Sequence, residues 1–222
     1  MRPASVTAVE TLSPHFRLVG LEGDALRAVD WAPGQKVQVA MGSGLTARTY
    51  TPMSWDADRG ATRVLAFSHG DGPGSRWANG LRVGDTCQFF GPRRSLDLAD
   101  LETPIVLFGD ETSFGLGGAL RDSRKGAAAT CVFEVSDLGE SRQVLEAIGL
   151  GDATVIERTA DDAHLARAET ELARLAAGGA LFILTGKASS IQHMSRVLKA
   201  ASVGSVRVKA KAYWAPGKTG LD

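Results

Sequence analysis

The chain has 222 residues, which is enough for one large domain or two compact ones with separate cores. Lysine and arginine together number 25, as do aspartate and glutamate, so the net charge is zero and no basic tail or stripe points to nucleic acid. Any selectivity for anions must be local, and the 26 glycines, gathered in short clusters, indicate turns and close backbone approaches rather than a disordered tract.

Short runs rich in β-branched and aromatic residues dominate the first hundred residues, and clusters of Gly, Pro, Asp and Asn separate them. Helical periodicity is almost absent there. The six runs cover residues 5–12, 15–21, 35–41, 48–53, 62–68 and 85–91. This spacing predicts a small antiparallel β-barrel of six strands.

The sequence pattern changes after Pro104, where apolar runs begin to alternate with helix-like segments. The apolar runs cover residues 105–109, 130–135, 153–158, 181–186 and 206–213. Strand–helix alternation predicts βαβ units and a parallel sheet. We therefore predict two domains, a β-barrel over residues 1–100 and an α/β domain over residues 104–222, with a boundary near 98–104.

The first candidate site is RTYT, residues 48–51. In a strand, Arg48 and Tyr50 point to one face, and Thr49 and Thr51 point to the other. A guanidinium beside an aromatic ring suits a planar anionic ligand, because the cation can hold a diphosphate while the ring stacks on a heterocycle. An ordinary strand with a packed tyrosine and a solvated arginine is the alternative.

The second candidate is HGDGPGSRW, residues 69–77. Sharp turns are allowed by its three glycines, Gly70, Gly72 and Gly74. Ser75 can cap the short helix that follows, so backbone N–H groups and a helix dipole converge as in a phosphate site. His69 alone is more typical of a structural hydrogen-bonding residue, and a loop without any ligand is the alternative.

Two further loops follow strands of the α/β domain. FGDETSFGLGG, residues 108–118, lies where ligands bind in such sheets, and it offers Glu111 and Thr112 at a helix start. Its glycines miss the G-x-G-x-x-G spacing, so the ordinary dinucleotide fingerprint is absent and a simple capping loop is the alternative. LTGKASS, residues 184–190, repeats the strand–glycine–helix arrangement with Gly186 and Lys187.

The segment VRVKAKAYW, residues 206–214, has a strict period of two. One face carries Arg207, Lys209, Lys211 and Tyr213. Three stacked cations repel one another unless an anion or carboxylates lie opposite. An anion site and a solvated edge strand are both consistent with this pattern.

Other chemistries leave no trace in the sequence. Cys87 and Cys131 are far apart in apparent strands, and no G-x-S-x-G elbow, nucleophilic cysteine motif or metal-ligand cluster occurs. The apolar runs are short, and the amino terminus has no signal-peptide core. We therefore expect a soluble, cytoplasmic protein without a resident metal or a membrane partner.

Taken in chain order, these segments resemble the siderophore-interacting proteins, which are flavin-dependent ferric-chelate reductases of the ferredoxin reductase-like superfamily. The resemblance runs from about Val6 to Lys218 and rests on RTYT, HGDGPGSRW with a following GP at 91–92, GDET, GKAS and a terminal YW followed by PGK. It implies an FAD-binding β-barrel followed by an NAD(P)-binding-like α/β domain.

The resemblance also implies roles for single residues. Arg48 would contact the FAD diphosphate, Tyr50 would stack on the isoalloxazine, and Thr51 would lie near the reactive nitrogen. The residues assigned to FAD are Arg48, Thr49, Tyr50, Thr51, His69, Gly70, Gly72, Pro73, Gly74, Ser75, Asp110, Glu111, Thr112 and Trp214. Those assigned to an anionic substrate are Lys209, Lys211, Tyr213 and Lys218. Those assigned to NAD(P)H are Arg158, Gly186 and Lys187, with an exposed loop arginine as the alternative at position 158.

The implied activity passes electrons from NAD(P)H or ferredoxin through FAD to Fe(III) held in a siderophore, and Fe(II) is released because hard oxygen chelators bind it weakly. The cofactor performs the redox chemistry, so no side chain is assigned a catalytic role. Two alternatives stay open: a general flavin electron-transfer reductase for another acceptor, and a non-catalytic siderophore- or nucleotide-binding protein.

Overall fold

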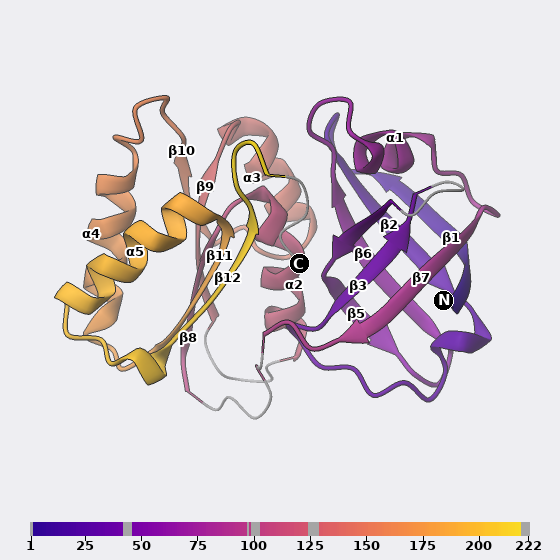
Figure 1. The fold of residues 1–222 in the computed structure, drawn as a ribbon, viewed down its shortest axis with the longest axis horizontal. Helices are drawn as coiled ribbons and strands as arrows, with labels where there is room; N and C mark the ends of the chain where they lie inside the picture. The colour runs from indigo at the N-terminus through magenta and orange to yellow at the C-terminus, as the bar shows by residue number, and fades with distance from the viewer. Residues whose placement is uncertain (1, 42–45, 97, 99–102, 124–128, 219–222) are drawn as a thin grey trace.

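The computed structural model describes residues 2–41, 46–96, 98, 103–123 and 129–218 (Figure 1). An antiparallel sheet from the first half of the chain lies beside a parallel sheet from the second half. The domain boundary expected at residues 98–104 lies largely outside the described residues. Cys87 and Cys131 are both buried and free.

The antiparallel sheet has seven strands within the described residues, in the order β4-β3-β7-β1-β2-β6-β5. The strands are β1 (Arg2–Thr11), β2 (Phe16–Glu22), β3 (Lys36–Ala40), β4 (Ala47–Tyr50), β5 (Pro52–Asp56), β6 (Ala61–Phe67) and β7 (Thr86–Arg93). A 3-10 turn, η1 (Asp24–Leu26), follows β2, and helix α1 (Pro73–Gly80) follows β6. Val19, Val39 and Val64 are among the fully buried side chains of the core inside this sheet.

The sheet has one strand more than predicted because the run 48–53 forms two strands. β4 ends at Tyr50 and β5 begins at Pro52, and these two strands lie at opposite edges of the sheet. Since Thr51 alone separates them in the chain, the two edges must come together and the sheet must curl into a barrel. Thr51 therefore marks the seam of the barrel.

The parallel sheet has five strands among the described residues, in the order β10-β9-β8-β11-β12. The strands are β8 (Ile105–Gly109), β9 (Ala129–Val135), β10 (Thr154–Glu157), β11 (Leu181–Lys187) and β12 (Val208–Trp214). The helices are α2 (Phe114–Ser123), α3 (Leu138–Ala147), α4 (Leu165–Ala176) and α5 (Ala188–Ala200), with 3-10 turns η2 (Glu111–Ser113) and η3 (Ser205–Arg207). The strand order reverses between β8 and β11, and in open α/β sheets the crevice at such a reversal is where ligands bind.

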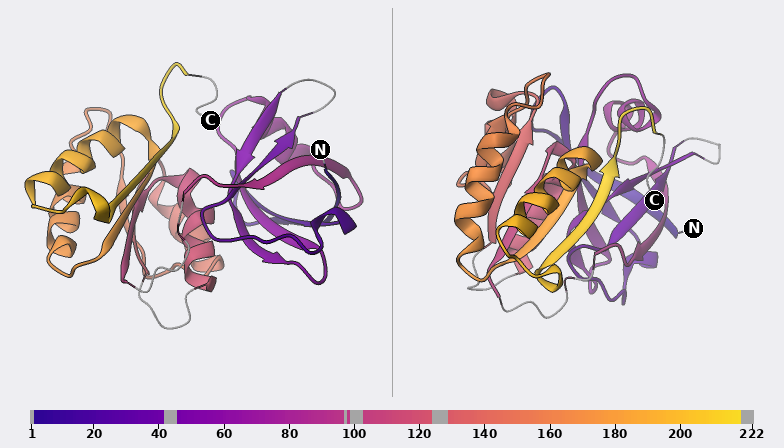
Figure 2. Two further views of the ribbon diagram at one scale, coloured as in Figure 1. Left: turned by 60° about the horizontal axis from the view of Figure 1, so that its bottom comes forward. Right: turned by 60° about the vertical axis from the view of Figure 1, so that its left-hand side comes forward.

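Helices cover both faces of this sheet, as buried parallel strands require. Alternate residues of β8 pack on opposite faces, with Leu107 in the core that contains α2 and α3 and Phe108 in the core that contains α4 and α5. β12 forms the edge of the sheet that borders the barrel (Figure 2). Arg207 belongs to η3 rather than to this strand, so the predicted face of the strand begins at Lys209.

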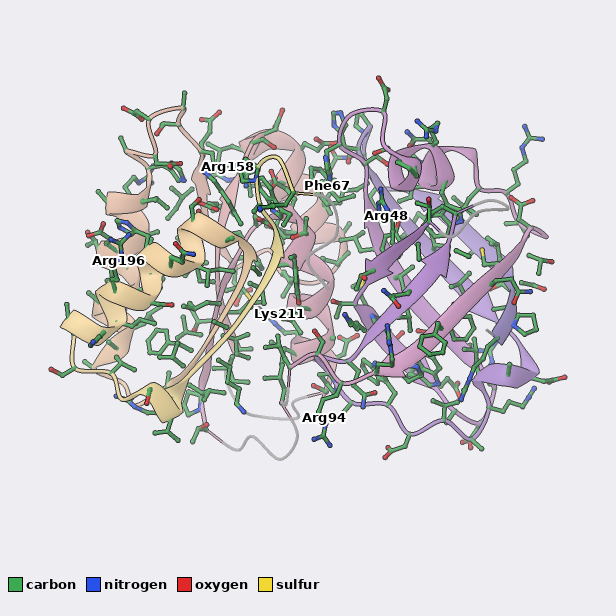
Figure 3. The ribbon with its side chains drawn as sticks, in the orientation of Figure 1. Arg48, Phe67, Arg94, Arg158, Arg196 and Lys211 are labelled. Atoms are coloured by element: carbon green, nitrogen blue, oxygen red, sulfur yellow. The ribbon has the colours of Figure 1, made fainter. Side chains whose placement is uncertain are left out.

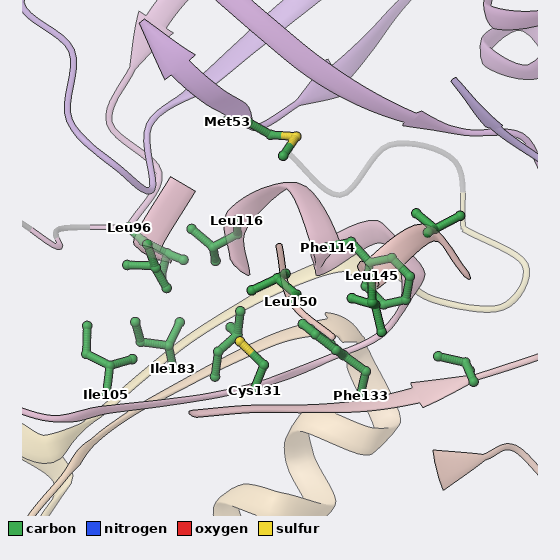
Figure 4. Close-up of a cluster of buried hydrophobic side chains, with 14 of the residues drawn as sticks. Met53, Leu96, Ile105, Phe114, Leu116, Cys131, Phe133, Leu145, Leu150 and Ile183 are labelled. Carbon is green, nitrogen blue, oxygen red and sulfur yellow. The ribbon is translucent and has the colours of Figure 1, made fainter. Parts of the chain in front are cut away.

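One apolar core joins the barrel to the parallel sheet. It contains Phe16 of β2 and Met53 of β5 together with Phe114 and Phe133 of the α/β half. Figure 4 shows Met53 above Phe114 and Phe133. The rings of Phe16 and Phe114 are stacked with centroids 5.5 Å apart. A shared core of this kind fixes the two halves relative to one another, so the groove between them is a stable feature.

The glycines of FGLGG serve this contact. A Cβ at Gly118 of α2 would lie 2.6 Å from the Sδ-methyl carbon of Met53, so the absence of a side chain lets α2 approach β5. The motif is therefore a helix-packing surface. Among the described residues, no helix combines the length and apolarity that crossing a bilayer requires.

Candidate functional site

A cavity of about 390 Å³ lies between the barrel and the end of β12. Residues of β4, β6, the loop into α1, η2, α2 and β12 converge on it. Figure 3 labels three of them, Arg48 and Phe67 of the barrel and Lys211 of β12. Its lining consists of Lys36, Ala47, Arg48, Thr49, Tyr50, Thr51, Leu65, Phe67, His69, Gly72, Gly74, Ser75, Ser95, Thr112, Gly115, Lys211, Tyr213, Trp214 and Lys218. The family resemblance implies contacts with FAD or with the substrate for thirteen of these residues, and the fold brings them together.

The lining is strongly basic although the chain has no net charge. Among the described residues that line the cavity, Lys36, Arg48, Lys211 and Lys218 carry a positive charge and none is a carboxylate. Walls that concentrate one sign of charge raise the local concentration of the opposite ion. The cavity is therefore suited to an anionic ligand.

Arg48 and Tyr50 project from the same face of β4. They pair across the strands with Val39 and Val37, which are both buried, so their side chains lie on the inner face of the sheet. One guanidinium nitrogen of Arg48 donates to the carbonyl of Ala47 at 2.8 Å, which leaves its other donors for a ligand. Burial raises the pKa of Tyr50, so its hydroxyl stays protonated.

The start of helix α1 forms a second wall. Gly72, Gly74 and Ser75 line the cavity, and the first N–H groups of a helix have no partner within it. A Cβ at Gly74 would lie 3.2 Å from Cγ of Arg48, so glycine allows the helix start to sit against the arginine. Backbone donors and a guanidinium thus converge on one region, as a phosphate site requires.

The role expected for Ser75 as the helix cap is wrong. The helix begins at Pro73 with Gly72 at the capping position, so Ser75 lies inside the first turn. Its hydroxyl donates to the carbonyl of His69 at 3.1 Å and thereby shapes the loop. Gly70, with φ of 62°, and Pro73 also shape the loop and do not line the cavity.

The end of β12 forms the third wall. Lys211, Tyr213 and Trp214 line the cavity, and Lys218 follows them, whereas Lys209 lies outside the lining. The side chain of Tyr213 interacts with Thr51, which connects β12 to the seam of the barrel. Burial raises the pKa of Tyr213 to about 12.

Asp110 lies behind this wall and does not line the cavity. Its side chain is fully buried, and Oδ2 accepts a hydrogen bond of 2.7 Å from Nε1 of Trp214. Oδ1 accepts from the backbone N and the hydroxyl of Thr112 at 2.9 and 2.5 Å. Burial raises the pKa of Asp110 to about 6.

Glu111 and Arg158 form an ion pair away from the cavity. Nη2 of Arg158 lies 2.8 and 2.6 Å from the two carboxylate oxygens of Glu111, which is 3% exposed. Glu111 also accepts hydrogen bonds from the backbone N and hydroxyl of Ser136. Arg158 is therefore engaged within the protein rather than exposed on a loop.

The two remaining residues assigned to NAD(P)H lie at the end of β11. Lys187 is paired with Asp162 at 3.0 Å, and Gly186 has φ of 98° with its backbone against Asp110. These groups lie at the carboxyl ends of the parallel strands, where dinucleotides bind in this class of sheet. None of them lines the cavity.

Several lining residues carried no signal in the sequence. Lys36 begins β3, which pairs with β4 so that the next residue, Val37, lies opposite Tyr50; this pairing brings Lys36 to the cavity. Phe67 lies between the rings of Phe16 and His69. Ala47, Leu65, Ser95 and Gly115 complete this group. The Arg93–Arg94 pair lies outside the lining, and the guanidinium of Arg93 stacks over Phe90 at 4.5 Å and bonds to Gln38.

Comparisons with known proteins identify the family to which the chain belongs. The family model described as "Siderophore-interacting FAD-binding domain" matches residues 42–96, and the one described as "Siderophore-interacting protein" matches residues 103–217. The second match alone spans 115 of 222 residues (217 − 103 + 1), more than half of the chain. No curated protein matches significantly.

Solved structures share the fold at low sequence identity. A siderophore utilization protein from T. fusca is 22% identical with a TM-score of 0.77, covering 100% of this chain and 95% of the other. The siderophore-interacting protein SipS from Aeromonas hydrophila is 20% identical with a TM-score of 0.77, covering 98% and 92%. The ferredoxin reductase in carbazole 1,9a-dioxygenase is 14% identical with a TM-score of 0.79, covering 96% and 69%. These likenesses establish the two-part ferredoxin reductase-like fold.

Proposed function

The chain belongs to the siderophore-interacting protein family, and from this premise we propose that it is an FAD-dependent oxidoreductase that takes electrons from NAD(P)H and reduces Fe(III) in a siderophore to release Fe(II). The observation that carries the proposal is the cavity between barrel and β12, where Arg48, the start of α1 and the aromatic end of β12 meet. This cavity offers cations and backbone donors on one side and aromatic rings on the other.

The residues that line the cavity fit FAD. A diphosphate needs several donors, and Arg48 with the N–H groups at Gly74 and Ser75 supplies them without any carboxylate in the lining. A planar heterocycle needs aromatic neighbours, which Tyr50, Tyr213 and Trp214 supply. We assign the diphosphate to Arg48 and α1, and the ring system to the aromatic wall.

When bound, FAD supplies a redox centre that can take up two electrons together and release them one at a time. The side chains bind and orient, and no proton transfer from the protein is needed for reduction of Fe(III). One NAD(P)H gives up two electrons as a hydride, which suffices for two ferric ions and leaves NAD(P)⁺, one proton and two Fe(II). Apolar contacts such as Phe67 against Phe16 keep water from one side of the site.

A ferric siderophore with an anionic chelate is the substrate that the basic rim favours. Lys211 lines the cavity, and Lys218, which is exposed, lies at its mouth. Long-range attraction of this kind acts on the encounter between protein and chelate and weakens with salt.

Replacing Lys211 with alanine should raise KM for an anionic ferric chelate about two- to fivefold, the effect of one partly exposed charge. The effect should shrink between 50 and 300 mM salt, because screening removes the same attraction, roughly within a Debye length of 10 Å. Lys209→Ala is the matched control, since Lys209 lies two residues earlier on the same strand but outside the cavity. Equal effects of the two substitutions would contradict a specific role for Lys211.

We place the nicotinamide donor at the carboxyl ends of β8 to β11, with Gly186 and Lys187 at that edge; ferredoxin is the alternative donor. Both cations there have internal partners, Glu111 for Arg158 and Asp162 for Lys187. A guanidinium held by a buried carboxylate gives a 2′-phosphate little extra attraction. NADPH and NADH should therefore be used about equally well.

Replacing Arg158 with glutamine should change kcat/KM for NADPH and NADH by the same factor. A lost charge-assisted contact to a 2′-phosphate would instead lower the ratio of the two values about tenfold or more. Because Arg158→Gln leaves Glu111 buried without its cation, Arg158→Lys serves as a second variant that keeps the charge. A selective loss of NADPH activity in either variant would show that Arg158 binds the 2′-phosphate.

The experiment that tests the proposal is the absorption spectrum of the purified protein. Bound FAD should give flavin absorption, NADH or NADPH should bleach it, and a ferric catecholate should restore it. A protein without flavin that binds a siderophore would be a non-catalytic binder. Flavin that is bleached by the donor but ignores every ferric chelate would make the protein a general electron-transfer reductase.

A further inference from the structure

Asp110 is a buried carboxylate directly behind the cavity wall. A carboxylate at 0% exposure is costly unless hydrogen bonds compensate for its lost hydration. One oxygen caps η2 through Thr112, and the other accepts the indole N–H of Trp214, which lies 104 residues away in the sequence. The second oxygen thus links the start of the α/β half to the last residue of β12.

Trp214 needs such a link because β12 is an edge strand. It pairs with β11 on one side, and its other side faces the groove toward the barrel. Its register shifts at Gly186/Lys187, so that Trp214 and Tyr213 both reach the cavity. The hydrogen bond from Trp214 to Asp110 holds this end of the strand, and the side chain of Tyr213 interacts with Thr51 of the barrel.

Capping by itself does not account for an aspartate at position 110. Serine and asparagine cap helices as well as aspartate does, and serine carries no buried charge. What aspartate adds is a second acceptor oxygen that reaches the indole. Gly186, with its backbone against the Asp110 carboxylate, leaves the room for it.

We infer that Asp110 is a positioning residue that, by accepting the indole N–H of Trp214, fixes the cavity wall formed by the end of β12 and so the orientation of the ligand. Asp110 does not line the cavity itself, whereas the resemblance implied an FAD contact at this residue. The inference rests on the proposed function, because FAD is the ligand whose binding reports on the wall.

The test compares Asp110→Ser, Trp214→Phe and the double variant. Asp110→Ser keeps a hydroxyl that can cap η2 but is too short to reach the indole, and Trp214→Phe keeps an aromatic ring but removes the N–H. Trp55→Phe is the matched control, since its indole N–H donates to the carbonyl of Leu26, away from the cavity. FAD dissociation constants are measured by titration, and tryptophan emission is measured on the flavin-free protein.

Each of the two variants should bind FAD about 3- to 10-fold more weakly, the loss of one net hydrogen bond. The double variant should bind no more weakly than the weaker single one, because both changes break the same link. Asp110→Ser should shift the tryptophan emission of the flavin-free protein, and this shift should vanish in the Trp214→Phe background. Trp55→Phe should leave FAD affinity unchanged.

Two results would overturn the inference. One is an Asp110→Ser protein that loses thermal stability but keeps wild-type emission and FAD affinity, which would make Asp110 a cap only. The other is a Trp214→Phe protein that binds FAD as tightly as the Trp55→Phe protein. This second result would refute the positioning role even if Asp110→Ser does not fold. A wild-type protein that binds no FAD would refute the proposed function, and the emission comparison would still test the link between Asp110 and Trp214.

Discussion

Replacing Arg48 with alanine should weaken FAD binding about 10- to 150-fold, the loss expected when a charge-assisted contact worth about 1.5–3 kcal/mol disappears. Arg48 is the cation that lies against the start of α1, and a single bond to the Ala47 carbonyl leaves most of its donors for the ligand. Isothermal titration of the flavin-free protein with FAD measures the effect.

Two further variants sharpen this test. Arg48→Lys keeps the charge but loses the fork of donors, so its affinity should fall between wild type and Arg48→Ala. Arg63→Ala removes an exposed arginine from β6 of the same barrel, outside the cavity, and should leave affinity unchanged. If the Arg48→Ala protein contained as much flavin as the wild type, the assignment of Arg48 to the diphosphate would be wrong.

Replacing Gly186 with alanine should lower the free energy of unfolding by about 3 kcal/mol. The backbone at Gly186 has φ of 98°, which costs a residue with a Cβ about 1–2 kcal/mol. The Cβ would also lie 2.6 Å from Cγ of Asp110, and displacing that carboxylate breaks buried hydrogen bonds worth about 1–3 kcal/mol. The midpoint temperature of thermal unfolding should fall by roughly 6–12 °C for a chain of this size.

Gly179→Ala separates the two contributions. Gly179 also has a positive φ, 72°, but a Cβ there would meet nothing within 4 Å, so only the backbone cost of about 1–2 kcal/mol applies. Gly186→Ala should also weaken FAD binding, because the displaced Asp110 would lose its hydrogen bond to Trp214. Equal losses of stability in the two variants would mean that the Asp110 carboxylate can move aside at Gly186→Ala without lowering the free energy of unfolding.

The barrel was predictable in kind but not in strand count. Alternating runs and turn residues indicate strands, and they gave the antiparallel sheet and the alternation of the second half correctly. The run RTYTPM reads as one strand, because the local pattern contains no sign that its two halves belong to opposite edges of a sheet. Closure of the barrel at Thr51 depends on contacts between residues far apart in sequence.

Part of the candidate site was likewise predictable from local motifs, and part depended on the tertiary structure. Arg48, Tyr50 and the glycine loop belong to local motifs whose chemistry suits a phosphate and a ring, and the cavity brings them together. Lys36 carries no such motif and reaches the cavity because β3 pairs with β4, a contact between strands that no local pattern indicates. Lys209 and Lys211 are indistinguishable in a strand with a period of two, and only the position of the groove separates them.

The sequence by itself determined the two-part architecture, the family and the segments that supply the basic and aromatic walls, because periodicity and short motifs are local properties of the chain. The tertiary structure alone decided which of these residues meet a ligand and which meet one another. Glu111 pairs with Arg158, and Asp110 accepts the indole of Trp214, because the ends of parallel strands distant in sequence converge at one edge of the sheet. Asp110, Glu111 and Arg158 thus bind partners within the protein. The cations placed to bind a ligand are those that line the cavity.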